Sequence, residues 1–292
     1  MSKVKTPLRY PGGKQKLTPF IVEILEENDL FGGHYVEPYA GGAGVAIELL
    51  LNDYVSHIYL NDISEPVYAF WYSMLNNTEK FCKDISRIPL DIDEWRKQKN
   101  IFKTERKNLY SLGFATFYLN RCNRSGILSG GAIGGIEQQG EWKIDARFQR
   151  NDLIGRIEAI ASRKDQISLT NLDAEYFITH NIPSLPKKTL VYCDPPYFKK
   201  ADSLYQNHYT PEDHLRISKV IQKKIKRPWV VSYDADPNIL SYYEKCEVFV
   251  YSLQYNAAKA YKGTEVFAFS DKLRIPLAST LSFINEALQT IH

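Results

Sequence analysis

The chain has 292 residues, of which 44% are hydrophobic and 24% are charged, and its formal net charge is +3. This composition is that of an ordinary globular protein and excludes the collagen-like, disordered and membrane-spanning classes. The N-terminus contains no apolar signal core, and the four cysteines have no zinc-site spacing. We therefore expect a cytoplasmic protein in a reducing compartment, with no bound metal and no membrane partner.

The N-terminal 64 residues predict a compact unit of alternating helices and strands. Apolar residues at helical spacing predict a helix over 16–30, and residues 34–37 and 56–60 have the pattern of short strands. A glycine-rich turn and a helix over 45–51 lie between these strands. Strand, glycine turn, helix and strand form one βαβ unit, in which the two strands run parallel.

Between residues 65 and 164 the pattern changes, because helical segments dominate and strand-like runs are scarce. A basic run lies between residues 95 and 107, and a nearly uncharged, glycine-rich segment covers 125–140. Residues 141–150 have a strand-like pattern. We interpret residues 65–164 as a mainly helical insertion between the two halves of an α/β sheet.

The α/β pattern resumes after residue 164. Further strands are predicted at 167–170, 189–193, 229–233, 248–253 and 265–270, and an amphipathic helix is predicted at 214–226. The predicted fold class is therefore α/β, with a Rossmann-like sheet formed by residues 1–64 and 165–292.

The sharpest chemical signal is Asp194-Pro195-Pro196-Tyr197, which follows the buried-looking strand over 189–193. Two consecutive prolines fix φ and remove two amide donors, so the loop that leaves this strand is stiff. The loop holds an acid and an aromatic ring at the carboxyl end of a central strand, where α/β sheets bind their ligands. An acceptor oxygen beside an aromatic face suits an amino group on a flat ring.

Two further acids end the first two strands. Glu37 leads into a glycine turn over 37–44, which lacks the G-x-G-x-x-G spacing of a pyrophosphate site. The acid at this position suits a cationic or amino-bearing ligand, and the alternative is a tight turn without a ligand. Asp62 ends the second strand, where an acid accepts hydrogen bonds from ribose hydroxyls, although it could instead cap the following helix.

These motifs, with the loop Leu8-Arg9-Tyr10-Pro11-Gly12-Gly13-Lys14, give the chain a family resemblance. The sequence resembles the Dam family, or D12 class, of DNA adenine-N6 methyltransferases over most of its length. The shared order is a Lys-bearing Gly-Gly loop, a glycine turn, a strand-end Asp, a helical insertion and Asp-Pro-Pro-Tyr. Phe117-Tyr118-Leu119-Asn120-Arg121, followed by Gly126, also resembles the start of that family's DNA-recognition region.

The resemblance implies a Rossmann-like methyltransferase sheet that binds S-adenosylmethionine (SAM). Tyr10 and Lys14 match cofactor-contacting positions, Asp62 matches the ribose-binding acid, and Asp173 falls where a contact with the cofactor adenine is expected. The residues that we expect to bind SAM are Tyr10, Lys14, Glu37, Asp62, Asp173 and Asp194.

The implied reaction is methylation of adenine N6 in double-stranded DNA, after the base has left the duplex. Tyr197 can stack on the flipped adenine, with Phe198 as a second wall. Asp194 and the Pro195 carbonyl can accept the two N6 hydrogens, and the carboxylate stabilises the positive charge that develops on N6. The expected catalytic residues are Asp194, Pro195, Pro196 and Tyr197, and the reaction needs no metal.

Residues 65–164 are then the expected DNA target-recognition domain. The candidate DNA contacts are Arg9, Arg121, Arg124 and Ser125, with Arg9 a candidate guanine reader through its two-donor fork. The basic run over 96–107 either contacts phosphates or forms a solvated helix face. A cognate restriction endonuclease is a candidate partner. Residues 129–135 lack the larger polar side chains of relatives that recognise GATC, so that site is not expected here.

Three alternatives compete with this interpretation. Methylation of RNA or of a protein amide is the first, although such enzymes usually carry Asn in place of Asp194. A non-catalytic DNA-binding regulator on a methyltransferase scaffold is the second. A nucleotide-dependent oxidoreductase is the third, and the absence of G-x-G-x-x-G disfavours it.

Overall fold

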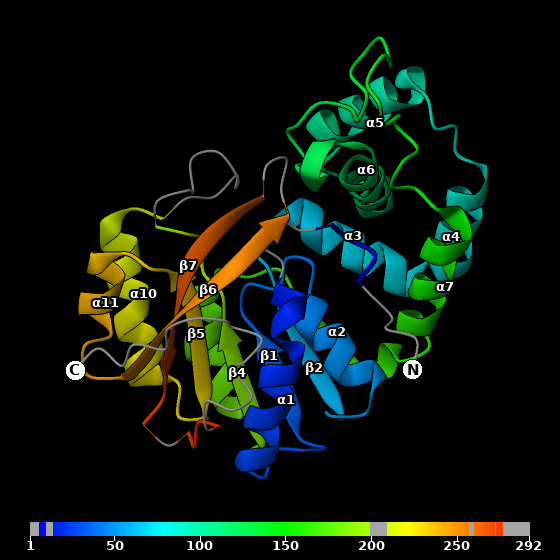
Figure 1. Cartoon of the computed structure of the whole chain (residues 1–292). Helices are drawn as coiled ribbons and strands as arrows, with labels where there is room; N and C mark the ends of the chain where they lie inside the picture. Colours follow the sequence, from blue (N-terminus) through cyan, green and yellow to red (C-terminus); the bar gives the residue numbers. More distant parts are fainter. Residues whose placement is uncertain (1–5, 10–13, 199–208, 257–259, 272, 277–292) are drawn as a thin grey trace.

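The computed structural model describes residues 6–9, 14–198, 209–256, 260–271 and 273–276, with the backbone alone described for 251–256 and 260–263. A seven-stranded sheet in the order β3-β2-β1-β4-β5-β7-β6 lies at its centre (Figure 1). The strands are β1 (His34–Glu37), β2 (His57–Asn61), β3 (Ile167–Thr170), β4 (Thr189–Cys193), β5 (Trp229–Asp234), β6 (Glu247–Asn256) and β7 (Ala260–Phe269). Every strand predicted for residues 1–64 and 165–292 is therefore confirmed.

The strand pairing brings the ends of distant segments to one edge of the sheet. Strands β3, β2, β1, β4 and β5 pair in parallel, whereas β7 runs antiparallel between β5 and β6. The register pairs Asp234 at the end of β5 with Glu265 on β7. Because parallel strands share one carboxyl edge, Glu37, Asn61, Cys193 and Asp234 end their strands on the same side of the sheet.

Two apolar clusters cover the two faces of the sheet, as the alternation of side chains along β4 requires. Leu190 and Tyr192 belong to one cluster, whereas Val191 and Cys193 belong to the other. Helices of the first half supply the first cluster, and helices of the second half supply the second. The helices of the sheet region are α1 (Thr18–Glu27), α2 (Gly44–Leu51), α8 (Ala174–Tyr176), α10 (Pro211–Lys224) and α11 (Pro237–Tyr242).

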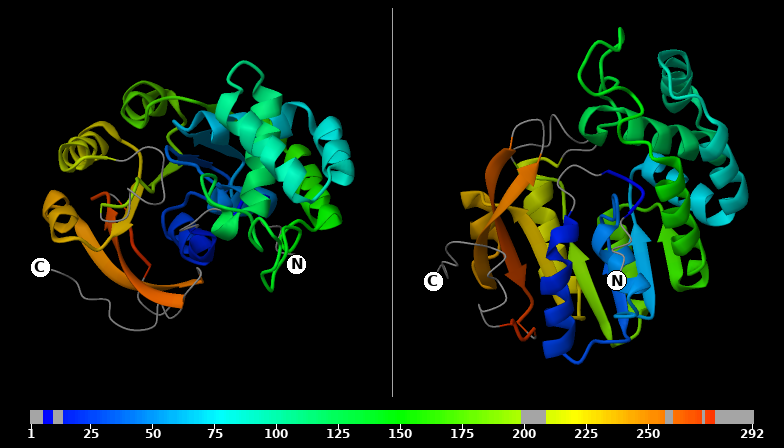
Figure 2. Two further views of the ribbon diagram at one scale, coloured as in Figure 1. Left: turned by 90° about the horizontal axis from the view of Figure 1, so that it is seen from above. Right: turned by 45° about the vertical axis from the view of Figure 1, so that its right-hand side comes forward.

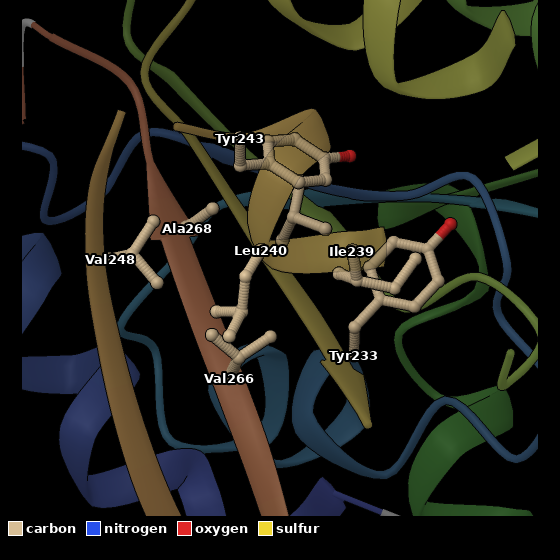
Figure 3. A pocket seen from close by; sticks show the side chains of 8 residues that line it. Tyr233, Ile239, Leu240, Tyr243, Val248, Val266 and Ala268 are labelled. Carbon is tan, nitrogen blue, oxygen red and sulfur yellow. The ribbon is translucent and has the colours of Figure 1, made fainter. Parts of the chain in front are cut away.

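The inner face of α11 packs on the antiparallel end of the sheet. Figure 3 shows the apolar side chains of this contact, which are Val231, Tyr233, Ile239, Leu240, Tyr243, Val248, Val266 and Ala268. The space between these side chains has no room for a water molecule, so this contact is core packing and does not form a ligand site.

The insertion between β2 and β3 is mainly helical, as predicted. It contains α3 (Glu65–Asn76), α4 (Thr78–Arg87), α5 (Ile92–Thr104), α6 (Leu109–Cys122) and α7 (Arg150–Ala161). The prediction of a strand-like segment over 141–150 is wrong, because residues 141–149 form turns and bends and Arg150 begins α7. The alternating apolar residues there, Ile144 and Phe148, are anchors that bury a loop in the helical core.

Helices α5 and α6 stand beyond the carboxyl edge of the parallel strands in Figures 1 and 2. Helix α3 lies between them and the sheet, and it packs on both α6 and β3. The insertion therefore borders the edge of the sheet where the strand-end acids gather. Within the described ranges, no helix combines the length and the apolar character needed to cross a bilayer.

Candidate active site

The Asp-Pro-Pro-Tyr loop leaves β4, whose five residues are all buried. The Asp194 side chain is 25% exposed, whereas Tyr197 is only 5% exposed. The next residue is held from β5, because the Phe198 amide donates to Asp234 Oδ1 at 2.8 Å. The loop thus presents an accessible carboxylate beside a buried phenol, and anchors on two neighbouring strands fix its course.

Lys14, which follows the Gly-Gly motif in the sequence, contacts the Asp194 carboxylate. Its Nζ lies 3.1 Å from Asp194 Oδ1 and donates to the Tyr197 hydroxyl at 2.9 Å. The same ammonium lies 3.3 Å from each carboxylate oxygen of Glu265. The Tyr197 hydroxyl in turn donates to Glu265 Oε1 at 2.7 Å. Lys14, Asp194, Tyr197 and Glu265 therefore form one hydrogen-bonded cluster, which we call the Lys14 cluster.

The two oxygens of Asp194 have different surroundings. Oδ1 accepts the Lys14 contact and also a 2.7 Å hydrogen bond from Ser232 Oγ on β5. Ser232 is itself held by the Tyr192 hydroxyl at 2.8 Å. Oδ2 takes part in none of these contacts. One oxygen thus orients the carboxylate, and the other is left to accept hydrogen bonds from a ligand.

The glycine turn after β1 contains two residues with left-handed backbone. Gly41 has φ of 47° and Ala43 has φ of 46°, both in the left-handed region that favours glycine. Glu37 lies beneath this turn, is 5% exposed, and accepts from the Ala46 amide of α2 at 3.2 Å. Burial raises the pKa of Glu37 to about 8, so its carboxyl is mostly protonated at neutral pH.

Asp62 links the glycine turn to the start of α3. Its Oδ2 accepts from the Gly41 amide at 2.8 Å, and its Oδ1 accepts from the Ser64 amide at 2.8 Å. Part of the side chain reaches solvent, but the surrounding protein is dense enough that burial raises its pKa to about 6. Each oxygen keeps a free lone pair for a hydroxyl. The neighbouring Ile63 is 51% exposed and offers an apolar surface beside it.

The two remaining residues that were predicted to bind a cofactor are Asp173 and Tyr10. Asp173 is exposed, and its carboxylate caps α8 by accepting from the Tyr176 amide at 3.1 Å. This contact is structural, and a role for Asp173 in cofactor binding stays a prediction. Tyr10 lies outside the described residues.

Asn120 of α6 clamps the backbone that leads to the Gly-Gly loop. Its Oδ1 accepts from the Arg9 amide at 2.7 Å, and its Nδ2 donates to the Arg9 carbonyl at 2.8 Å and to the Gly126 carbonyl at 3.0 Å. A Cβ on Gly126 would lie 2.4 Å from the Arg9 carbonyl oxygen, so only glycine fits this contact. Arg9 is therefore attached to the insertion through its backbone.

The predicted DNA contacts divide into two groups. Arg121 is 8% exposed, its guanidinium donates to the Arg147 carbonyl at 2.7 Å, and burial lowers its pKa to about 10. These contacts favour a structural role for Arg121. Arg124 is exposed, Ser125 is half-buried with a left-handed φ of 56°, and Arg9 is half-buried near Arg147. These three residues remain accessible candidates.

The loop that was mistaken for a strand carries an aromatic residue at the surface. Trp142 is 60% exposed, and the Arg147 guanidinium carbon lies 5.9 Å from its ring centroid. The Gln138 side chain organises this loop, since it donates to the Ile133 and Gly135 carbonyls and accepts from the Ile144 amide. An exposed indole beside a guanidinium can stack on nucleic-acid bases.

Sequence reasoning missed Glu265, Ser232, Ile63 and Trp142. Ile63 follows a strand-end acid directly, and this position was a usable signal for an exposed apolar residue beside the candidate site. Glu265 and Ser232 gave no local signal. They reach the Lys14 cluster only because β5 and β7 pair in one particular register.

Asp194, the glycine turn and Asp62 lie along one edge of a Rossmann-like sheet that carries an inserted helical domain, which is the arrangement expected of a methyltransferase. The comparison with known families agrees with this class. Residues 10–268 match the family described as D12 class N6 adenine-specific DNA methyltransferase, and the chain belongs to that family.

Individual relatives are distant in sequence. The chain is 22% identical over 246 residues to the type II methyltransferase M.MjaIII of Methanocaldococcus jannaschii. The matched region covers 77% of this chain and 82% of that protein. It is 25% identical over 205 residues to the modification methylase StsI of Streptococcus sanguinis, covering 66% of this chain but only 29% of that longer protein.

Among solved structures, the rRNA methyltransferase AviRa from Streptomyces viridochromogenes resembles the chain with 11% identity and a TM-score of 0.35. The matched region covers 92% of this chain and 89% of that one. At this level of similarity the fold class rests on the observed strand order alone.

Proposed function

We propose that this protein transfers a methyl group from SAM to N6 of an adenine that is flipped out of double-stranded DNA, as a site-specific adenine methyltransferase. The observation that carries this proposal is the hydrogen bonding of the two Asp194 carboxylate oxygens. One of its oxygens is oriented by Lys14 and Ser232, and the other is free of these contacts at the carboxyl edge of the sheet. Family membership supports adenine as the target base.

The proposed reaction uses Asp194 as an acceptor for the target amine. N6 is a poor nucleophile because its lone pair is delocalised into the ring, and hydrogen bonds to Asp194 and to the Pro195 carbonyl favour a more localised lone pair. Positive charge grows on N6 during transfer, so a fixed carboxylate binds the transition state more strongly than the ground state. Pro196 keeps the loop stiff, and Tyr197 borders the adenine.

The residues at the glycine turn fit SAM. Asp62 has lone pairs for the ribose hydroxyls beside the glycine turn, and Ile63 offers an apolar cover for the adenine ring. Glu37 is suited to the amino acid part of the cofactor, whose ammonium would favour its ionised form. When bound, SAM supplies the electrophilic methyl group.

DNA binding is proposed for the insertion over 65–164 and for the segment that precedes Lys14. Arg9, Arg124 and Ser125 remain the candidate contacts, and we add Trp142 and Arg147, which lie together on the surface. A basic surface with an exposed indole suits contacts to both phosphates and bases. A cytoplasmic location and a cognate restriction endonuclease are part of this proposal.

The proposal is tested in three separate reactions, each with the purified protein and tritiated SAM. The acceptor is double-stranded DNA in the first, RNA in the second and a protein extract in the third. We expect label in DNA alone. Label in RNA or protein with none in DNA would favour the alternative acceptors. Specific DNA binding without transfer to any acceptor would favour a non-catalytic regulator.

A further inference from the structure

Glu265 is a buried carboxylate in the middle of the active site, and the function described so far does not use it. It is 2% exposed and lies on β7, opposite Asp234 of β5. An ionised carboxylate at this depth is unfavourable unless it is paired and hydrogen-bonded. Its contacts with the Lys14 ammonium and the Tyr197 hydroxyl supply such partners.

The charges of the Lys14 cluster suggest what this carboxylate does. Lys14 alone beside Asp194 would offset the negative charge that is meant to stabilise the developing cation on N6. Glu265 lies 3.3 Å from the same ammonium, so Lys14 is shared between two acids. When all three groups are ionised, the trio Lys14, Asp194 and Glu265 keeps one net negative charge.

The hydrogen bonds of the cluster have a fixed direction as well. Lys14 donates to the Tyr197 oxygen, and the Tyr197 hydroxyl proton is directed to Glu265 Oε1. The tyrosine ring is thereby held at its polar end from two sides. Ser232 holds Asp194 Oδ1 independently of Glu265.

We propose that Glu265 is a positioning residue for methyl transfer: it fixes Lys14 and Tyr197, and it offsets the Lys14 charge so that Asp194 meets the target amine as an effective anion. This inference rests on the proposed function, because it assigns a role in that reaction. Glu265 contacts the catalytic loop through Tyr197 and Lys14, so its influence on the amine is indirect.

The first test replaces the charge and keeps the shape, with Glu265→Gln. The amide oxygen can still accept from Tyr197, but the negative charge is lost. We expect the single-turnover rate of methyl transfer, at saturating SAM and DNA, to fall by about 10–100-fold. Dissociation constants for SAM and DNA should change less than about threefold, because this effect belongs to the transition state. Glu247→Gln on β6, an exposed site, is the matched control and should be unchanged.

Rescue by a shorter acid separates an electrostatic role from a structural one. Glu265→Asp restores the charge on a shorter side chain and should be faster than Glu265→Gln. A purely structural role would favour Glu265→Gln, which keeps the length and shape of the side chain.

Two outcomes would overturn the inference: a normal rate for Glu265→Gln, or Glu265→Asp no faster than Glu265→Gln. Thermal unfolding of each variant identifies one that fails to fold, and the rate of the other variant relative to the wild type then provides the test. If the wild-type protein transfers no methyl group to DNA, the proposed function itself fails, and this result is visible before any variant is compared.

Discussion

At the scale of single residues, Tyr197 is where the structure changes the expectation most. The sequence suggested a stacking platform, for which only the aromatic face matters. The structure shows in addition a hydroxyl that accepts from Lys14 and donates to Glu265. A phenol that is hydrogen-bonded on both sides within a buried cluster leaves its partners unsatisfied when it is removed.

The first prediction compares two substitutions of this residue. Tyr197→Ala should lose most methyl transfer, because base stacking on an aromatic ring is worth about 1–3 kcal/mol and the cluster also loses its centre. Tyr197→Phe should show an intermediate loss, since the ring remains. Single-turnover rates at saturating DNA measure both. A Phe variant as slow as the Ala variant would assign the function of Tyr197 to the hydroxyl alone, whereas normal rates for both would place the adenine pocket elsewhere.

The second prediction concerns Asp62, whose pKa is raised to about 6 by burial. If its ionised form holds the ribose, protonation below that pKa should weaken SAM binding by about tenfold for each pH unit. Asp62→Asn should bind SAM weakly and should lose the change of affinity near pH 6, while any change near pH 8 that comes from Glu37 remains. Calorimetry between pH 5 and pH 8 tests this, and equal affinities for wild type and variant would leave Asp62 as a support for the glycine turn only.

At the scale of secondary-structure elements, the basic residues of α5 and of the turn that follows it do not all have the same surroundings. Lys99 is half-buried, donates to the Gly130 carbonyl at 3.3 Å and lies 4.4 Å from the Trp95 ring centroid. It therefore has a structural role in holding the glycine-rich loop. Lys103 and Lys107 are exposed, and they are better candidates for phosphate contacts.

The third prediction follows from that difference. The double variant Lys103→Ala/Lys107→Ala should reduce the slope of log affinity for DNA against log salt by up to about 0.9 for each lost phosphate contact. Affinity for SAM should stay constant. The matched control is Lys223→Ala/Lys224→Ala at the exposed end of α10. Identical salt slopes for all three proteins would mean that Lys103 and Lys107 are simply solvated.

The fourth prediction concerns the Asn120 clamp between α6 and the segment before Lys14. Asn120→Asp replaces the amide donor by an oxygen that faces the Arg9 and Gly126 carbonyls. Leaving buried carbonyls unpaired costs about 1–3 kcal/mol of unfolding free energy. Denaturant unfolding should detect this loss, whereas Asn76→Asp at an exposed site on α3 should stay close to wild type. Equal stability of the two variants would contradict the clamp.

Sequence reasoning worked best where the signal is local. Apolar periodicity gave the strands and the first helices, and the Asp-Pro-Pro-Tyr loop identified the end of β4. It failed over residues 141–150, where Ile144 and Phe148 anchor a loop but mimic strand alternation. Glu265 could not be found in this way, because it lies 251 residues from Lys14 in the chain and only the antiparallel pairing of β7 brings them together.

At the scale of the whole molecule, the insertion and the edge of the sheet have different surfaces. The sheet edge carries the acids, and the insertion carries the exposed cations and Trp142. Arg9 is bonded to the insertion through Asn120, whereas Lys14 is bonded to Asp194 at the sheet edge. A protein that must bind a duplex and also act on a single base needs both surfaces close together. The assignment of residues 65–164 to target recognition remains a proposal that follows from this arrangement.

The most direct test of the account is nucleoside mass spectrometry of plasmid DNA from a host without adenine methylation that produces either the wild-type protein or Asp194→Ala. We predict N6-methyladenine with the wild type, and a loss of about 10²–10³-fold in transfer rate for the variant, because one preorganised charge partner is removed. DNA without N6-methyladenine, or equal methylation by a folded Asp194→Ala variant, would contradict the central role given to the carboxylate at the end of β4.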